Sequence, residues 1–526
     1  MHIMVIGDVG WSDFYHLGDE AMTEFALQAL TTRGVERITL VAGEPEYAAE
    51  LYGVDSVPRL GFSMKARTRN AARAEKILAF ARGDDSALAP TDTARDTVAA
   101  LRSADALLVA GGGNLNSMFD HHVHDRSTLA ALAREFGIPY ALTSQTLGPL
   151  VIDEDRPQLT DLFAGAVVVG AREDHTDRAV RALLGPDTGR VVRQTDDAWS
   201  LTARPEDHAA MSDWTAGGEY IVLSLAERPS SPVISWRTYW DMNVELCRRI
   251  RRATGMRLLL VPHAGAFEGS ADAKQDQVTN ARCVAAVGDP DVVATEQVTA
   301  RELVALTSRA RAVVGTRYHA GILAAAAAVP HVSLAPNMYS SVRMRGAARN
   351  VGTEQFVLPY DDLDAIVRTV RSIAVDGFDR TAALDHLARV SRLRTEEHRA
   401  HWDFVVDSLR GGGSTPATHA PVDVLENRTE GADPRVALAR LDVVEAYGRK
   451  YQELSFDRGR HKAAAEAARA DLDRLRAKEA ERAARAVRTP GTAGAAGAID
   501  AAVKAKRTLK LRTCLGRAVR RLRGRS

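Results

Sequence analysis

The stretch AVVGTRYHAGILAAAAA, residues 312–328, decides the fold class of this chain. Its apolar start, ending at Gly315, predicts a buried strand, and its alanine-rich end predicts a helix packed closely on that strand. Arg317 and His319 fall at the first turn of the helix, where an α/β protein binds anions through free backbone N–H groups and the helix dipole. Burying this pair requires an anion to compensate it. The pattern predicts an enzyme acting on a phosphorylated or carboxylated small molecule.

Short apolar runs alternate with helical patterns on both sides of this stretch. That alternation is the order of βαβ units and predicts parallel sheets. The expected strands are Ile3–Ile6, Ile38–Val41, Ala106–Ala110, Tyr140–Ser144, Ala166–Gly170, Val191–Gln194, Tyr220–Leu225, Arg257–Val261, Val292–Ala294, Ala312–Gly315 and His331–Leu334.

The strands fall into two sets, which predicts an α/β protein with an N-terminal Rossmann-like domain at 1–205 and a C-terminal one at 218–410. We expect a cleft between them. A glycine-rich linker follows at 411–433. Residues 434–488 predict long helices with imperfect heptads, which leaves a coiled coil and self-association open. Residues 489–526 are a small-residue linker and a basic amphipathic tail.

The composition is that of an ordinary globular protein, with a net charge of +1. The chain starts with a strand and not a signal sequence, and no apolar run is long enough to span a bilayer, so we expect a cytoplasmic protein. The cysteines match no zinc spacing, and we expect no metal. The tail favours the inner face of the plasma membrane over nucleic acid, with an unassigned solvated tail as the alternative.

Polar residues and glycines follow several expected strands in the first half. Gly18, Asp19 and Glu20 are either a capped helix start or carboxylates that bind substrate hydroxyls. Gly111–Asn114 allows a ligand to approach the backbone, or forms a structural turn. Gln145 follows the next strand. The segment Asp120–Asp125 contains three histidines, for which we favour a polar surface loop over a metal site.

The second half repeats this arrangement with cations. Arg228 and His263 follow two of its expected strands, as Thr316 and Arg317 follow a third. Because the carboxyl ends of parallel strands meet at one edge of a sheet, we expect these residues to surround one site. For His263 alone, a packed or capping residue is the alternative.

Taken in order, these motifs resemble the polysaccharide pyruvyl transferase family. The resemblance covers Met1 to Leu358. It depends on these motifs: Gly18-Asp19-Glu20, Gly111-Gly112-Gly113, Gln145 to Pro149, Ala171 to Asp174, Asp196-Asp197-Ala198, Arg317 to His319 and Val329-Pro330. The family often has a lysine in a Tyr-x-x-Lys arrangement, whereas this chain has Tyr339 followed by Arg343, which could supply the cation, as could Arg345.

The resemblance implies a GT-B-like fold and transfer of the enolpyruvyl group of phosphoenolpyruvate onto saccharide hydroxyls, as a ketal, with release of phosphate. It implies polysaccharide biosynthesis for the cell envelope, on a cell-surface or lipid-linked acceptor, with no cofactor besides the donor substrate. The expected catalytic residues are His319, Asp19 and Glu20. The expected donor-binding residues are Arg317, Arg228, His263, Thr316 and Arg343. The expected acceptor-binding residues are Gly18, Gly112, Gly113, Asn114 and Gln145.

Two other interpretations stay open. A GT-B glycosyltransferase that uses a nucleotide sugar would have the same fold, because a fold does not determine a reaction. A catalytically silent scaffold at the membrane, binding a partner through the helical extension, would keep the fold and lose the activity.

Overall fold

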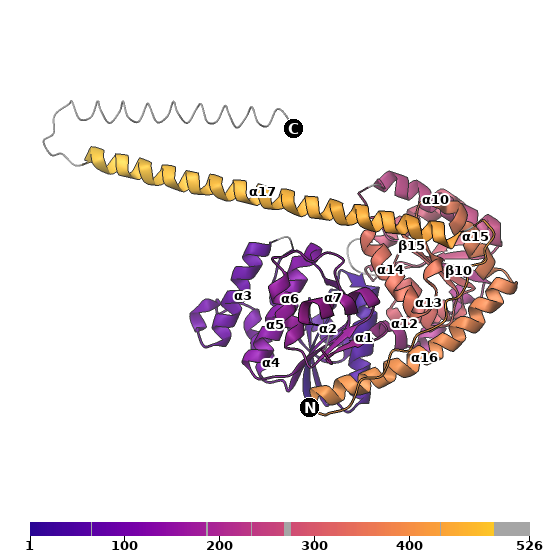
Figure 1. Cartoon of the computed structure of the whole chain (residues 1–526), viewed down its shortest axis with the longest axis horizontal. Helices are drawn as coiled ribbons and strands as arrows, with labels where there is room; N and C mark the ends of the chain where they lie inside the picture. Colours follow the sequence, from indigo (N-terminus) through magenta and orange to yellow (C-terminus); the bar gives the residue numbers. More distant parts are fainter. Residues whose placement is uncertain (65, 186–187, 233, 268–274, 432, 489–526) are drawn as a thin grey trace. The chain divides into compact units, whose positions relative to one another are not determined.

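Two parallel sheets organise the chain in the computed structural model, which describes residues 1–64, 66–185, 188–232, 234–267, 275–431 and 433–488 (Figure 1). The first sheet has the order β4-β3-β1-β5-β7-β8-β9, with β6 paired to β7. Its strands are β1 (His2–Ile6), β3 (Arg37–Ala42), β4 (Asp55–Pro58), β5 (Ala106–Val109), β6 (Gly112–Leu115), β7 (Tyr140–Leu147), β8 (Val168–Ala171) and β9 (Val191–Arg193).

The second sheet has the order β13-β11-β10-β14-β15-β16. Its strands are β10 (Tyr220–Ser224), β11 (Arg257–Leu260), β13 (Val292–Ala294), β14 (Ala312–Gly315), β15 (His331–Ala335) and β16 (Val357–Pro359). Each expected strand is present in one of the two sheets. The strands β4, β6 and β16 were not predicted. The strands β4 and β16 have only one and two apolar residues before a closing proline, and β6 lies in the glycine-rich stretch after β5.

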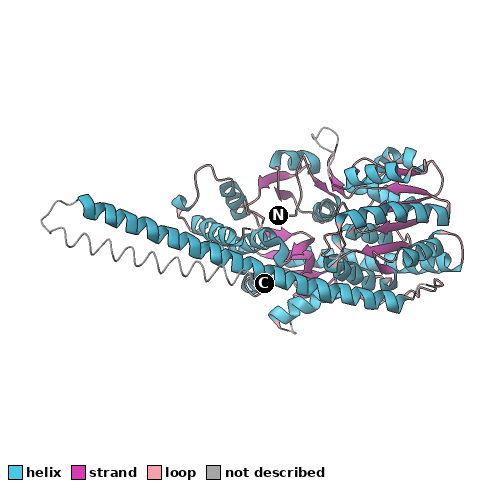
Figure 2. Cartoon of the chain, turned by 90° about the horizontal axis from the view of Figure 1, so that it is seen from above, coloured by secondary structure: helices cyan, strands magenta, loops and turns pink. Residues whose placement is uncertain are grey.

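Helices cover both sheets, as the cyan and magenta ribbons of Figure 2 show. In the first half they are α1 (Leu17–Thr32), α2 (Pro45–Tyr52), α3 (Arg67–Ala81), α4 (Ala94–Arg102), α5 (Asp120–Glu135), α6 (Arg156–Ala164), α7 (Asp174–Leu184), α8 (Pro205–Ala210) and α9 (Ser212–Thr215), with the 3-10 turns η1 (Asp85–Ala87), η2 (Ser117–Phe119) and η3 (Asp197–Ser200). In the second half they are α10 (Trp236–Thr254), α11 (Asp276–Val287), α12 (Ala300–Arg309), α13 (Tyr318–Ala326), α14 (Met338–Asn350), α15 (Leu363–Ala374), α16 (Phe378–Leu409) and α17 (Pro434–Arg488), with η4 (Glu354–Phe356).

Small residues bring α13 close to the second sheet. A Cβ added to Gly315 would lie 3.0 Å from the Ser224 carbonyl oxygen and 3.1 Å from the Ala320 Cβ. A Cβ on Gly321 would lie 3.0 Å from the Ser333 Oγ. The alanine-rich sequence therefore sets the distance between helix and sheet, and it places the first turn of α13 directly at the end of β14.

A short antiparallel ladder joins the two halves. The strand β2 (Tyr15–His16) of the first half pairs with β12 (Ala264–Gly265) of the second. Beside it, the Leu17 N–H donates to the His263 carbonyl oxygen at 3.0 Å. Helix α16 adds contacts with the first half, since the Trp402 Nε1 donates to the Asp197 Oδ1 at 3.2 Å. The two sheets are thus parts of one packed unit.

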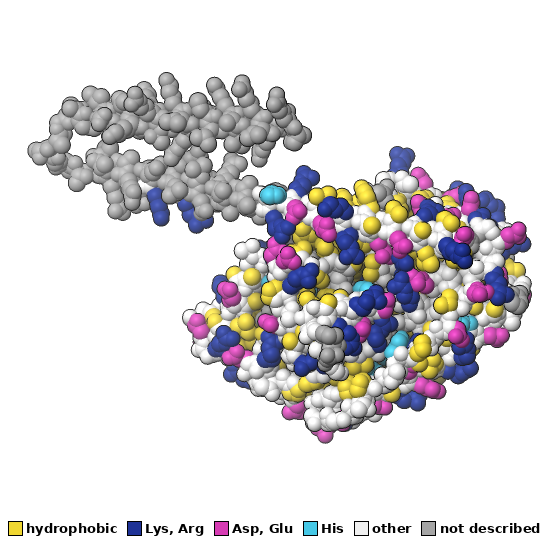
Figure 3. Space-filling model, in the orientation of Figure 1, with side chains coloured by type: hydrophobic (Ala, Val, Ile, Leu, Met, Phe, Trp, Pro, Cys, Tyr) yellow, Lys and Arg dark blue, Asp and Glu magenta, His cyan; other side chains and the backbone are white. Residues whose placement is uncertain are grey.

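That compact unit covers Met1–Gln452, and the rest of α17 belongs to a second unit. The predicted tail, 489–526, lies outside the described residues. Lys and Arg (69) and Asp and Glu (68) are nearly balanced, and Figure 3 shows both signs mixed over the visible face. Among the described residues, none of the helices has the length and apolarity required to cross a bilayer.

Two buried histidines make the stability of this fold depend on pH. Burial lowers the pKa of His331, on β15, to about 4, and burial with nearby cationic side chains lowers that of His401, on α16, to about 3. An unfolded histidine titrates near pH 6.5, so the unfolded state binds more protons below that pH. The stability is full above pH 7 and decreases as the pH falls below about 6.5.

We expect each histidine to lower the free energy of unfolding by about 2 kcal/mol between pH 7 and pH 5. Urea unfolding at the two pH values measures this loss. The His331→Gln variant should lose about 2 kcal/mol less than the wild type over this range, whereas His461→Gln, at an exposed position on α17, should match the wild type. A wild-type slope in His331→Gln would contradict the assignment.

Candidate active site

A cavity of about 340 Å³ lies at the carboxyl ends of both sheets. It follows β1 and β5 in the first sheet and β10 and β14 in the second, and between each of these pairs the strand order reverses. Ligands bind at such points in doubly wound sheets. The first half contributes Asp8, Trp11, Phe14, His16, Gly18, Asp19, Gly113, Asn114, Phe119, His122 and Arg172 to its lining. The second half contributes Ala226, Arg228, Ser230, His263, Thr316, Arg317, Tyr318, His319, Pro336, Asn337, Tyr339, Ser340 and Arg343.

The imidazole of His319 packs directly on Gly18, so the first turn of α1 meets the first turn of α13. A Cβ at position 18 would overlap the ring, which explains why glycine is needed there. The His319 Nε2 lies 3.6 Å from the Oδ2 of the buried Asp196. Although burial alone would raise it, the pKa of Asp196 is held well below its usual range by His319 and Arg172.

Arg317 is neutralised by the protein itself. Its Nε donates to the Asp276 Oδ2 at 2.9 Å and its Nη2 to the Oδ1 at 2.5 Å. The same carboxylate accepts from the backbone N–H groups of Glu227 and His263. Asp276 is thus the anion that compensates the buried charge of Arg317. The sequence did not indicate this pair, because Asp276 lies 41 positions away, on α11.

A second pair of arginines converges on Gly113. A Cβ there would lie 2.6 Å from the Arg343 Nη1 and 2.9 Å from the Arg172 Nη2. Arg343 stacks on Tyr339, with its Cζ 3.7 Å from the ring centroid, and makes no ion pair with any described carboxylate. Arg172 is fully buried and pairs with Asp196 at 2.6 Å, yet its Nη2 has no hydrogen-bond partner within the described parts of the chain. This is the region of the cavity best suited to an anion.

The other predicted donor residues line the cavity in different ways. The Thr316 Oγ1 accepts from the Ala226 N–H at 2.8 Å and so stabilises the strand end. Burial, with help from the charges of Arg317 and His319, holds the pKa of His263 well below its usual value, so this ring is neutral. The Arg228 side chain is 71% exposed and lies 3.4 Å from Glu227, at the rim.

The first-half side of the cavity combines aromatic rings with carboxylates. The Asp8 Oδ2 lies 3.1 Å from the His122 Nε2, and Arg59 also pairs with Asp8. The Arg59 guanidinium covers the Trp11 ring, with its Cζ 5.3 Å from the centroid. Asp19 pairs with the His16 Nδ1 at 2.6 Å. Burial opposes ionisation, but His16 keeps the pKa of Asp19 below its usual value, so Asp19 is ionised.

Three predicted site residues do not line the cavity, and we remove them from the site. Glu20 is buried, its Oε1 accepts from the Gly10 N–H at 3.3 Å, and burial raises its pKa well above the usual value. The Gln145 amide donates to the carbonyl oxygens of Ala110 and Thr143, both at 2.8 Å, within the sheet. Gly112 is buried in β6, where it pairs with Gln145. All three residues lie in the interior of the first half.

The histidine-rich segment is not the surface loop that we favoured. It forms the first turns of α5, and His122, His124, Asp120 and Asp125 are all buried there. The reason is Arg59, whose Nη2 pairs with Asp125 at 2.6 Å and brings a cation into the cluster. Within the described ranges, no group of three His, Cys, Asp or Glu side chains is placed to hold a metal ion.

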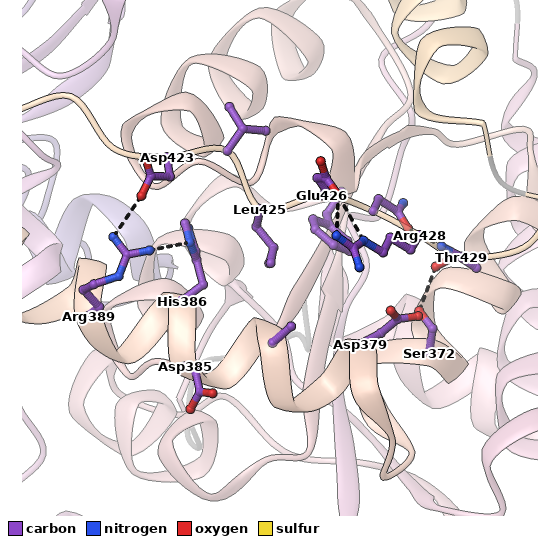
Figure 4. Close-up of a pocket in the computed structure, with 14 residues that line it drawn as sticks. Ser372, Asp379, Asp385, His386, Arg389, Asp423, Leu425, Glu426, Arg428 and Thr429 are labelled. Carbon is purple, nitrogen blue, oxygen red and sulfur yellow. Dashed lines mark hydrogen bonds and ion pairs between the residues drawn. The ribbon is translucent and has the colours of Figure 1, made fainter.

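A larger cavity, of about 420 Å³, lies between α16 and the segment around Leu425 (Figure 4). It is remote from the strand ends and contains none of the predicted residues. Its side chains pair with each other, since Arg389 lies 3.5 Å from Asp423 and the Ser372 Oγ 2.8 Å from the Thr429 Oγ1. We therefore take the strand-end cavity as the candidate active site.

The two parallel sheets and the helices that cover them form a GT-B-like fold. The Listeria monocytogenes protein assigned as a UDP-N-acetylglucosamine 2-epimerase is 12% identical, with a TM-score of 0.52, over 79% of this chain and 98% of that one. Anabaena HepE, solved with UDP and glucose, is 11% identical, with a TM-score of 0.49, over 78% of this chain and 98% of that one. No curated protein matches in sequence. At these identities the likeness concerns the fold, and it confirms the predicted fold class.

The chain belongs to the polysaccharide pyruvyl transferase family, whose model matches residues 16–337. It is therefore an enzyme. The matched residues include Gly18, Asp19, Arg172, Arg317 and His319, which all line the strand-end cavity.

Proposed function

We propose that this enzyme transfers the pyruvyl group of phosphoenolpyruvate to a saccharide in the strand-end cavity. The observation that carries the proposal is the convergence of Arg343 and Arg172 on Gly113, with His319 ion-paired to Asp196 in the same cavity. Phosphoenolpyruvate has a phosphate and a carboxylate, and arginine binds both through paired N–H donors. Asn337 caps α14 beside these arginines. The backbone N–H groups in the first turn of this helix favour an anion.

His319 is the proposed general acid. It donates a proton to the methylene carbon of the enol, which leaves an oxocarbenium-like carbon that a sugar hydroxyl attacks. Attack by a second hydroxyl breaks the bond between that carbon and the phosphate oxygen, which completes the ketal and releases phosphate. One of the two hydroxyl protons restores His319, and the other leaves with phosphate or goes to solvent. The Asp196 carboxylate, 3.6 Å from the His319 Nε2, is the proposed group that orients the ring.

The first-half side of the cavity is the proposed acceptor subsite. Aromatic faces such as Trp11 and Phe119 suit the apolar face of a sugar ring, and carboxylates suit its hydroxyls. Asp19 is ionised and is the proposed group that orients or accepts the proton of the attacking hydroxyl. Gly18, Gly113 and Asn114 complete this side.

Arg317, Arg228, His263 and Thr316 remain part of the proposed donor side, with Arg317 held in place by Asp276. From the sequence alone, we further propose a cell-envelope saccharide as acceptor and contact of the basic tail with the inner face of the plasma membrane. Self-association through the helical extension stays a proposal of the same kind.

Phosphoenolpyruvate should stabilise the wild-type protein against heat at concentrations where UDP-sugars do not, because a ligand that binds only the folded state raises its melting temperature. With a crude saccharide acceptor it should also release phosphate. Stabilisation by UDP-sugars alone would instead favour a nucleotide-sugar glycosyltransferase and overturn the proposal.

The Arg343→Gln variant should raise the KM for phosphoenolpyruvate about 10- to 100-fold, since a charge-assisted contact contributes about 1.5–3 kcal/mol. Phosphate release at varied donor concentration measures it. The matched control is Arg349→Gln, on the same helix, whose side chain pairs with Glu354 and does not line the cavity. Equal KM values for the two variants would remove Arg343 from the donor site.

A further inference from the structure

The C-terminal extension packs against the helix that carries Arg343. Between α16 and α17 the chain runs along the second half, where the Leu425 N–H donates to the Gly352 carbonyl oxygen at 2.8 Å. From Pro434, α17 then lies against α14, with Leu441 fully buried. This part of α17, up to Gln452, belongs to the same compact unit as both sheets.

Glu445 is the main polar contact between the two helices. Its Oε1 accepts hydrogen bonds from the Ser341 Oγ at 2.6 Å and from the Arg345 Nη1 at 2.9 Å, and both donors lie on α14. Arg345 is only 10% exposed and also pairs with Asp442 and Glu354. Gly448 brings the backbones close, because a Cβ there would lie 2.5 Å from the Met338 Cβ.

The other face of α14 faces the cavity. The Tyr339 hydroxyl donates to the Gly113 carbonyl oxygen at 2.6 Å, and Arg343 stacks on the Tyr339 ring. Residues two apart on a helix point about 200° away from each other. Tyr339 and Arg343 therefore point away from Ser341 and Arg345, and α14 lies between the cavity and α17.

We propose that the beginning of α17 positions α14 for donor binding, with Glu445 as a positioning residue that sets the location of Tyr339 and Arg343. The family model ends at residue 337, so this contact is a feature of this chain beyond the matched region. The proposal rests on the proposed function insofar as the anion bound beside Arg343 is phosphoenolpyruvate. In this view the extension is part of the catalytic unit.

The test replaces Glu445 with alanine in the full-length protein. We expect faster hydrogen–deuterium exchange of the amides of α14, and a KM for phosphoenolpyruvate raised about 10-fold with a smaller change in kcat. Glu445→Gln keeps an acceptor oxygen and the side-chain length and should stay within about threefold of the wild type. The matched control is Val443→Ser, on the same helix at a 68% exposed position, which should change neither quantity.

A double variant separates positioning from general destabilisation. In an Arg343→Gln background, Glu445→Ala should raise the KM by less than about twofold, because Arg343, the donor-binding group that Glu445 positions, has already been removed. If the KM of the double variant increased by the full factor of about 10, the inference would be overturned. Unchanged hydrogen–deuterium exchange of α14 in the Glu445→Ala variant would overturn it as well. If the wild type releases no phosphate from phosphoenolpyruvate, the proposed function fails, and the exchange rates of α14 still decide whether Glu445 positions it.

Discussion

Replacing His319 with alanine should lower kcat about 10²- to 10⁴-fold and leave the KM for phosphoenolpyruvate within about threefold. The ring is the proposed proton donor, and it lies 3.6 Å from Asp196 rather than against the arginines proposed to bind the donor. The arginines that would hold the donor are unaffected by the change. Steady-state phosphate release at several donor concentrations separates the two constants.

The control for this experiment is His461→Ala, at an exposed position on α17, which should behave as the wild type. Thermal stabilisation by phosphoenolpyruvate should persist in His319→Ala, since donor binding is intact. A raised KM with normal kcat would instead make His319 a donor-binding residue and would leave the proton donor unidentified.

Replacing Gly18 with alanine should lower kcat about 100-fold, although the change is only one methyl group. The new Cβ would occupy the position of the His319 imidazole, so the ring must leave its place beside Asp196. Alanine is about 1 kcal/mol better than glycine within a helix, so α1 itself should not be weakened. Phosphate release and thermal unfolding, measured together, check both statements.

The same substitution in a His319→Ala background provides the control. With the ring absent, the methyl group at position 18 meets empty space, and Gly18→Ala should cause no further loss of activity. Normal activity of the single Gly18→Ala variant would show that the ring can move without consequence, and it would contradict the tight placement of His319.

Much of the fold could be predicted because each long strand is a buried apolar run, such as Tyr220–Leu225. Such runs are typical of the strands of a parallel sheet that is covered on both faces. The edge strands β4 and β16 could not be predicted, because they have only one and two apolar residues before a closing proline.

The candidate site was predicted where a residue directly follows a strand, as with Arg317, His319 and Asp19. Prediction failed where a side chain points into the interior of the first half, as with Gln145 and Glu20. The spacing of residues in the sequence does not show in which direction such a side chain points. It also failed for pairs made across the chain. Arg172 and Arg343 are far apart in sequence, and only the packing of α14 on the first half brings both to Gly113.

The ladder of β2 with β12 has a consequence for how this enzyme can evolve. Residues 15–18 and 263–265 form one shared edge, and the glycine that accommodates His319 lies in the half of the chain opposite to the histidine. If either half were exchanged for that of a distant homologue, the residues on the two sides of this edge would no longer match beside His319. A substitution on one side of this edge therefore has to be accommodated on the other side for the contact between Gly18 and His319 to be kept.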